Sequence, residues 1–108
     1  MKNSFTVEEA QRQVAGSEDG LYGVLFEHGT MELGYYKPLK VDEQSPHVKD
    51  EIYVVRSGTG LFVVDGERQP FAPGDALFVP AGVEHRFEDF SDDFEAWVIF
   101  YGRSGGER

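Results

Sequence analysis

The chain has 108 residues, enough for one domain, and 40% of them are hydrophobic, which supplies a packed core and excludes a disordered protein. The 20 acidic and 10 basic side chains give a formal net charge of −10, which disfavours nucleic acids and anionic membrane surfaces as partners. Cysteine is absent, so disulfides, thiolate metal sites and a cysteine nucleophile are excluded. The N-terminal residues lack the apolar run of a signal peptide, and no stretch has the length of a membrane helix, so we expect a cytoplasmic protein.

Residues 1–20 form a predicted lead-in segment. Thr6 and Glu9 have the spacing of a capping box, which predicts a short helix over residues 7–14. A turn is predicted over residues 17–20. An extended segment packed across a sheet edge is the alternative that these residues leave open.

From residue 21 onward, short runs rich in Val, Ile, Phe and Tyr alternate with Gly, Pro and Asp. This pattern predicts an all-β domain over residues 21–102, an antiparallel sandwich or barrel, followed by a flexible glycine-rich tail at 103–108. Asp65 and Gly66 predict a two-residue hairpin turn. The expected strands are Leu21–Glu27, Thr30–Tyr36, Glu51–Val55, Gly60–Val64, Glu67–Phe71, Ala76–Val79, His85–Phe87 and Phe94–Tyr101.

Two histidines and one glutamate have the pattern of metal ligands. His47 and Glu51 are four residues apart at the start of an apolar run, and on an extended chain both project to one face. An inward carboxylate is costly unless it is paired or bound to metal. If the strand of His85 faces that of Glu51, three ligands of a divalent metal could converge. On spacing alone, a surface or packing role for each residue is the alternative.

A motif of four fixed positions lies in the second half of the domain. Residues 74–85 contain Gly74, five residues, Pro-x-Gly, two residues and His85. This resembles the second motif of the cupin family, and the chain over residues 34–101 is similar to a small single-domain cupin. Asp89 stands where that motif usually has Asn. The resemblance implies a double-stranded β-helix, the jelly-roll barrel of that family.

The first cupin motif is present in part. Its pattern is His-x-His, three or four residues, Glu, six residues and Gly, and the matching residues are His47, Glu51 and Gly58. Ser45 stands at the place of the first histidine, with Gln44 beside it. The resemblance implies one divalent ion, Fe, Mn, Ni or Zn, which this ligand set does not distinguish. The implied ligands are His47, Glu51 and His85, with Gln44 or Ser45 as additional ligands of the metal or of a water molecule.

Residues near the ligands are candidates for supporting roles. The second ring nitrogens of the two histidines should donate to a carboxylate or carbonyl, with Asp50, Glu84 and Asp89 as candidates. Lys49 is expected to face outward, and His28, in a hairpin turn, is expected not to be a ligand. Trp97 has the opposite parity to Val98 and is expected to face a second sheet or a partner chain. The candidate pocket residues are Tyr53, Phe87, Tyr36 and Phe100, which would suit a small organic acid, enol or aromatic molecule.

Two functions remain open at this point. The first is a metal-dependent enzyme of dioxygenase, isomerase or lyase type that acts on a small organic molecule through a mononuclear divalent ion, and we favour this interpretation. The second is a non-catalytic module that binds or senses a small ligand, with or without metal. Open sheet edges and the resemblance both imply a two-fold homodimer.

Overall fold

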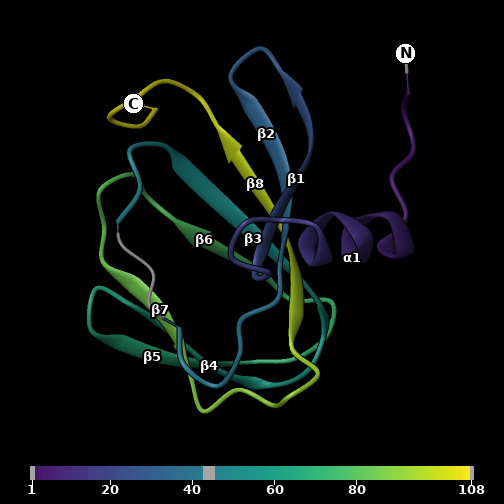
Figure 1. Ribbon diagram of the computed structural model, residues 1–108. Helices are drawn as coiled ribbons and strands as arrows, with labels where there is room; N and C mark the ends of the chain where they lie inside the picture. Colours follow the sequence, from purple (N-terminus) through teal and green to yellow (C-terminus); the bar gives the residue numbers. More distant parts are fainter. Residues whose placement is uncertain (1, 43–45, 108) are drawn as a thin grey trace.

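The computed structural model describes residues 2–42 and 46–107. Gln44 and Ser45, the expected additional ligands, lie outside the described residues. Within the described part, the chain forms one helix and eight strands (Figure 1). They are α1 (Val7–Ala15), β1 (Tyr22–His28), β2 (Met31–Tyr36), β3 (Asp50–Ser57), β4 (Gly60–Val64), β5 (Glu67–Phe71), β6 (Ala76–Val79), β7 (His85–Glu88) and β8 (Glu95–Tyr101).

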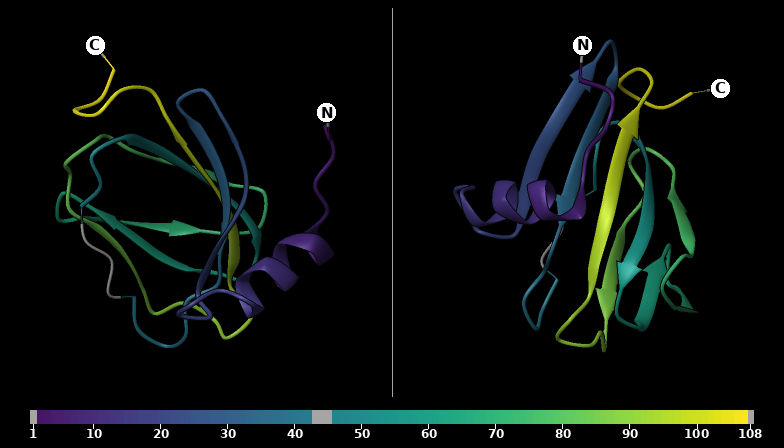
Figure 2. Two further views of the ribbon diagram at one scale, coloured as in Figure 1. Left: turned by 45° about the horizontal axis from the view of Figure 1, so that its top comes forward. Right: turned by 90° about the vertical axis from the view of Figure 1, so that its right-hand side faces the viewer.

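The strands form two antiparallel sheets that face each other (Figure 2). The larger sheet has the order β1-β2-β8-β3-β6, and the smaller has the order β5-β4-β7. The core fills the space between them and is rich in aromatic rings. The all-β antiparallel prediction is confirmed. The buried core residues are Tyr36, Tyr53, Val55, Phe62, Phe71, Val79, Phe87, Phe94, Ala96 and Val98.

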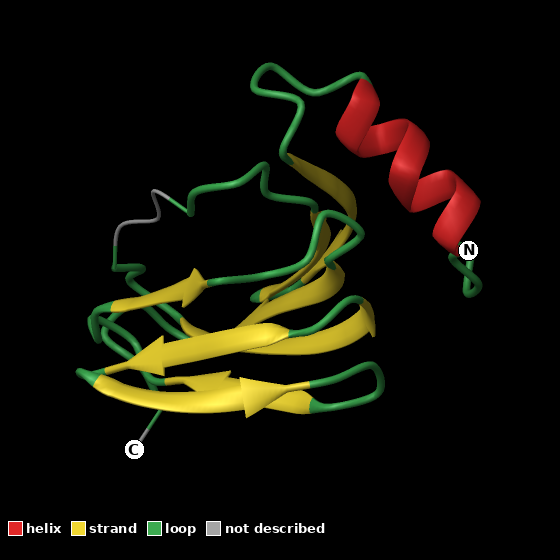
Figure 3. Cartoon of the chain, turned by 90° about the horizontal axis from the view of Figure 1, so that it is seen from below, coloured by secondary structure: helices red, strands yellow, loops and turns green. Residues whose placement is uncertain are grey.

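Helix α1 begins as the capping box predicts, because the Thr6 hydroxyl accepts a hydrogen bond of 3.1 Å from the Glu9 backbone N–H. Its buried residues Ala10 and Val14 pack on Tyr35, on the outer face of the larger sheet (Figure 3). The predicted helix is therefore confirmed, and the extended alternative is not.

The helix also explains the position of Trp97. The indole ring of Trp97 packs edge-on against Tyr35, with ring centroids 5.0 Å apart, and belongs to the cluster beneath α1. The expectation of a second sheet or a partner chain at this residue is corrected, because the lead-in helix occupies that face. Gly23 on β1 lets the helix approach this closely, since a Cβ atom there would lie 2.7 Å from the Gln13 carbonyl carbon.

The hairpin between β4 and β5 turns at Asp65 and Gly66, whose φ angles of 51° and 81° are those of a two-residue hairpin turn.

No helix in the part of the chain that the structure describes has the length and apolar character needed to cross a membrane.

The C-terminal residues, expected to be flexible, contact the start of β3. The Gly105 N–H donates to the Val48 carbonyl at 2.7 Å, and the Glu107 N–H donates to the Asp50 carboxylate at 2.8 Å. The second oxygen of Asp50 accepts the Ala81 N–H at 2.9 Å. These backbone donors lower the pKa of Asp50. One carboxylate thus joins the tail, β3 and the loop before β7.

Candidate metal centre

The alternation of β3 sets the direction of Glu51. Glu51 and Tyr53 point between the two sheets and are buried, whereas Ile52 points outward. Glu51 lies opposite Val79 on β6 and Phe100 on β8, so it is flanked by strands on both sides. Only 1% of the surface of Glu51 is exposed, which places an acidic side chain inside an aromatic core.

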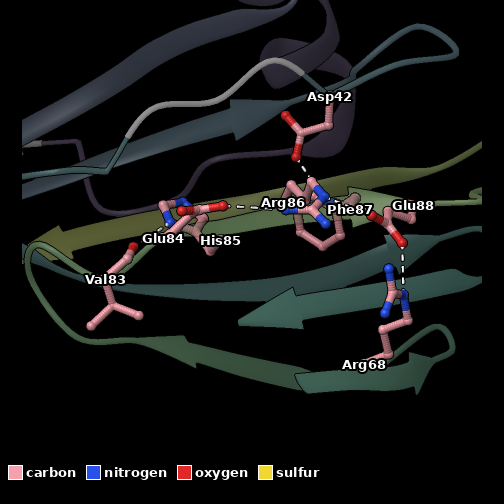
Figure 4. A network of polar contacts seen from close by, with 8 residues as sticks. All are labelled: Asp42, Arg68, Val83, Glu84, His85, Arg86, Phe87 and Glu88. Carbon is pink, nitrogen blue, oxygen red and sulfur yellow. Dashed lines mark hydrogen bonds and ion pairs between the residues drawn. The ribbon is translucent and has the colours of Figure 1, made fainter. Parts of the chain in front are cut away.

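His85 reaches the same place from the smaller sheet, where it begins β7. Its Nδ1 lies 3.0 Å from the Val83 carbonyl oxygen (Figure 4). A carbonyl only accepts, so this contact places the ring proton on Nδ1 and leaves the lone pair on Nε2. The expectation of a carboxylate or carbonyl partner is confirmed for this histidine by the Val83 carbonyl, whereas the candidates Asp50, Glu84 and Asp89 do not take that place. The tight turn before β7 brings that carbonyl within reach.

His47 completes the group from the segment before β3. Its Nε2 is 3.9 Å from Glu51 Oε1, and His85 Nε2 is 3.3 Å from the same oxygen. The three ligand atoms lie within 4.8 Å of one another, so these residues could hold a metal ion. The Gly82 N–H donates to the His47 carbonyl at 2.7 Å, which ties the two motif segments together.

The chemistry of this group fits a divalent cation. Within the described residues, Glu51 Oε1 and His85 Nε2 are buried and have no hydrogen-bond partner. When the His85 ring is neutral, both atoms are acceptors in the tautomer that Val83 favours, so they face each other lone pair to lone pair across 3.3 Å. An uncompensated arrangement of this kind is unfavourable, and a cation between the two atoms would satisfy both.

The pKa values of the two histidines are shifted in opposite directions. Burial lowers the pKa of His47, and the neighbouring His85 lowers it further against the opposing effect of Glu51. Burial also disfavours the charged form of His85, but its contacts with Glu51 and with the Val83 carbonyl outweigh burial and raise its pKa. In the metal-free protein a proton is therefore the competitor for the position between His85 and Glu51.

A cavity of about 600 Å³ opens beside this group. Tyr36, Tyr53 and Phe100 lie in its wall, and a substrate contact by any of them stays a prediction. Phe87 is not among the described lining residues. The described residues that line the cavity are Asp19, Leu21, Tyr22, Tyr36, His47, Glu51, Tyr53, Val98 and Phe100.

Phe87 lies deeper in the core than we expected. It is 2% exposed and its ring packs edge-on against Tyr53 at 5.0 Å and at an angle against Phe94 at 4.6 Å. Phe87 is two residues after His85 on β7, so both side chains point to the same face of the strand. At the position of Phe87, however, that face is covered by packed aromatic rings of the core.

Sequence reasoning missed Asp19, Leu21 and Tyr22 as cavity residues. They lie at the end of the lead-in segment and at the start of β1, where no motif marks them. The pairing of the two strands was the one available signal for Tyr22: Tyr22 lies directly opposite Tyr36 in the β1–β2 hairpin, and Tyr36 was already a candidate pocket residue.

Two residues lie away from the group. Lys49 Nζ donates to the Thr30 carbonyl at 2.9 Å, outside the cavity. His28 is at the end of β1 and stacks on Phe26, with ring centroids 6.1 Å apart.

A family model described as a cupin domain matches residues 33–100, more than half of the chain. The chain belongs to the cupin family. This cupin is 34% identical over 99 residues to an uncharacterized protein of Streptomyces coelicolor, a match that covers 90% of the chain and 93% of the relative. It is also 42% identical over 80 residues to an acireductone dioxygenase of Rhodopseudomonas palustris. That match covers 60% of the chain and 48% of the dioxygenase, so the cupin spans about half the length of that relative.

Solved structures with the same fold include a protein from Neisseria meningitidis, with a TM-score of 0.69 and 19% identity over 93% of this cupin and 100% of that chain. A cupin 2 conserved barrel domain protein from Salinispora arenicola has a TM-score of 0.67 and 22% identity, and the match covers 94% of this cupin and 89% of that chain. At these identities the likeness shows the fold.

Proposed function

We propose that this cupin binds one divalent metal ion through His47, Glu51 and His85 and acts on a small organic molecule held in the adjacent cavity. The observation that carries the proposal is the buried pair of acceptors, Glu51 Oε1 and His85 Nε2, which face each other at 3.3 Å without a hydrogen-bond partner among the described residues. A bound ion would supply Lewis-acid polarisation of a ligand oxygen, or redox chemistry if it is iron.

The residues of the chain would set the conditions for that chemistry. The Val83 carbonyl holds the imidazole of His85 in the tautomer that presents Nε2. Phe100 packs edge-on against the His47 ring, with ring centroids 4.9 Å apart, which restricts the ring and keeps water from that side. The apolar wall, with Val98 and Leu21, would exclude water from a bound molecule.

A dioxygenase, isomerase or lyase reaction fits this arrangement equally well. The similarity to acireductone dioxygenase supports the first of these, over the part of that protein that the chain covers. A non-catalytic module is favoured by one residue, Ser45, because it stands where the family has a fourth, tighter-binding imidazole ligand. Turnover that depends on one specific divalent ion would distinguish the enzyme from the module. A cytoplasmic location stays a prediction of the sequence.

Metal content tests the proposed centre directly. We expect protein purified without a chelating tag to retain close to one divalent ion per chain after equilibration and dialysis. His47→Ala and His85→Ala should each weaken metal binding at least tenfold, since loss of an outer partner of a ligand alone costs about 10- to 100-fold. Elemental analysis and calorimetric titration with Zn²⁺ would measure this.

The matched control is His28→Ala, because His28 is the remaining histidine of the chain and lies outside the group. It should bind the ion as the wild-type protein does. Full metal content in His85→Ala would remove that residue from the centre and contradict the proposal.

We also propose that the protein is a two-fold homodimer. Helix α1 covers the outer face of the larger sheet at β1 and β2, whereas Ile99, Ile52 and Phe78 continue as a cross-strand row on the same face toward the edge strand β6. Phe78 is 51% exposed. A second copy would bury this apolar row.

Light scattering at micromolar concentration should therefore give the mass of a dimer, and Phe78→Asp should shift it to a monomer. Val48→Asp is the control, because Val48 is 67% exposed and lies off the sheet. A wild-type monomer would contradict the proposal.

A further inference from the structure

Two tyrosines lie side by side in the wall of the cavity. Tyr22 on β1 and Tyr36 on β2 are directly opposite in the hairpin, so their side chains share the inner face of the larger sheet. Tyr36 pairs with Ala96 on β8, four residues from Phe100, the partner of Glu51, whereas the Tyr22 hydroxyl reaches Glu32, which pairs with that same Phe100. The wall of the cavity therefore has a polar patch besides the metal ligands.

The hydroxyl proton of Tyr22 is engaged in a hydrogen bond to a carboxylate. It donates to Glu32 Oε2 at 2.8 Å. The ring reaches this position by lying across Gly34, where a Cβ atom would collide with the phenol. The glycine and the glutamate, two residues apart on β2, together fix where the phenol lies and which way its proton points.

The hydroxyl of Tyr36 is committed in the same way. It donates to Asp42 Oδ1 at 2.5 Å, and Asp42 is 8% exposed. The other oxygen of Asp42 accepts the Phe87 N–H at 2.7 Å, on the free edge of β7, which holds the carboxylate in place (Figure 4). Burial and the neighbouring carboxylate each raise the pKa of both tyrosines far above the usual value, so both phenols keep their protons.

A phenol has one proton and accepts with its remaining lone pairs. Because both protons point to carboxylates, the two oxygens can offer only acceptor lone pairs to a molecule in the cavity. Asp19 adds an anionic acceptor at the wall, where the N–H groups of Leu21 and Tyr22 hold its Oδ1 at 2.8 and 3.2 Å. No lysine or arginine is among the described residues that line the cavity.

We propose that the tyrosine side of the cavity recognises hydrogen-bond donors, that is, hydroxyl or amino groups on a neutral or cationic organic molecule, and that it rejects carboxylates and phosphates. This inference names the ligand class of the site under the proposed function and rests on the cavity being the ligand site. It does not depend on a bound ion. A molecule that presented only acceptors would leave its own oxygens facing those of Tyr22 and Tyr36, with the carboxylate of Asp19 adding repulsion.

Four small probes of one shape test this preference in the metal-free protein: benzyl alcohol, benzylamine, benzyl methyl ether and benzoate. Titrations followed by the ring-proton NMR signals of Tyr22 and Tyr36 would report binding at the patch. We expect the alcohol and the amine to bind at least fivefold more tightly than the ether and benzoate, the difference that one or two net hydrogen bonds make. Equal binding of benzoate and benzylamine, or no response to any probe, would overturn the inference.

A pair of variants tests the cause of the preference. Glu32→Ala frees the proton of Tyr22 to turn toward the cavity, so the preference for the alcohol over the ether should fall to within about twofold. Glu27→Ala removes the same charge from the exposed cross-strand neighbour of Glu32 and should keep the wild-type preference. If Glu32 served only the fold, Glu32→Ala would weaken the binding of all four probes by the same factor. Because no ion takes part, failure here would leave the metal-content result of the proposed function intact.

Discussion

At a pH above the raised pKa of His85, where its ring is neutral, Glu51→Gln should abolish metal uptake and leave the metal-free fold as stable as the wild type or up to about 2 kcal/mol more stable. The carboxylate of Glu51 is buried, and Oε1 faces the lone pair of His85 Nε2. A glutamine amide has nearly the same shape but can donate to that nitrogen, so it would replace an acceptor–acceptor contact by a hydrogen bond. Zn²⁺ titration and chemical unfolding of the metal-free protein would measure the two effects.

The adjacent acidic residue gives the matched control. Asp50 is also buried, but its two oxygens accept the N–H groups of Ala81 and Glu107. Asp50→Ala should therefore lower the free energy of unfolding, because it leaves two backbone donors without their partner. A loss of stability in Glu51→Gln as large as that in Asp50→Ala would mean that Glu51 supports the fold rather than a metal ion.

Gly58→Ala should cost about 2–5 kcal/mol of stability, a large part of what a domain of this size has. Gly58 has a φ of +89°, which disfavours any side chain, and an added Cβ would lie 2.5 Å from the Cα of Phe94. Two hydrogen bonds hold the chain this close. The Ser91 N–H donates to the Thr59 carbonyl at 2.9 Å, and the Ser91 hydroxyl accepts the Thr59 N–H at 3.0 Å. Denaturant unfolding would measure the loss.

The control separates backbone strain from the collision. Gly66 has a similar φ of +81°, but an added Cβ there would meet nothing within 4 Å. Gly66→Ala should therefore cost only about 1–2 kcal/mol. Equal losses in the two variants would show that the approach of Phe94 contributes nothing at Gly58.

Local signals predicted the local structure well. The capping pair Thr6 and Glu9 gave the start of the helix, and Asp65 with Gly66 gave the hairpin, because each of these features depends on residues within one turn. Strand parity was sufficient to direct Glu51 inward, since alternate residues of a strand necessarily point to opposite faces.

Features that depend on two distant segments could not be predicted in this way. Parity gives the face of a strand but not the depth along the barrel, so Phe87 was expected in the cavity although neighbouring rings enclose it. The carbonyl of Val83 has no side-chain signature in the sequence, yet it selects the tautomer of His85. The contribution of Asp19 to the cavity depends on where α1 docks on the sheet, which is a property of the tertiary packing.

The attachment of the tail to Asp50 has a practical consequence for handling this protein. The tail bonds to Val48 and to Asp50, so a fluorophore, linker or oligohistidine extension added behind Glu107 would perturb the segment that carries His47 and Glu51, although the Asp50 side chain itself faces away from Glu51. The opposite terminus leads into α1, on the far side of the larger sheet (Figure 2). Extensions are better placed there when metal affinity is to be measured.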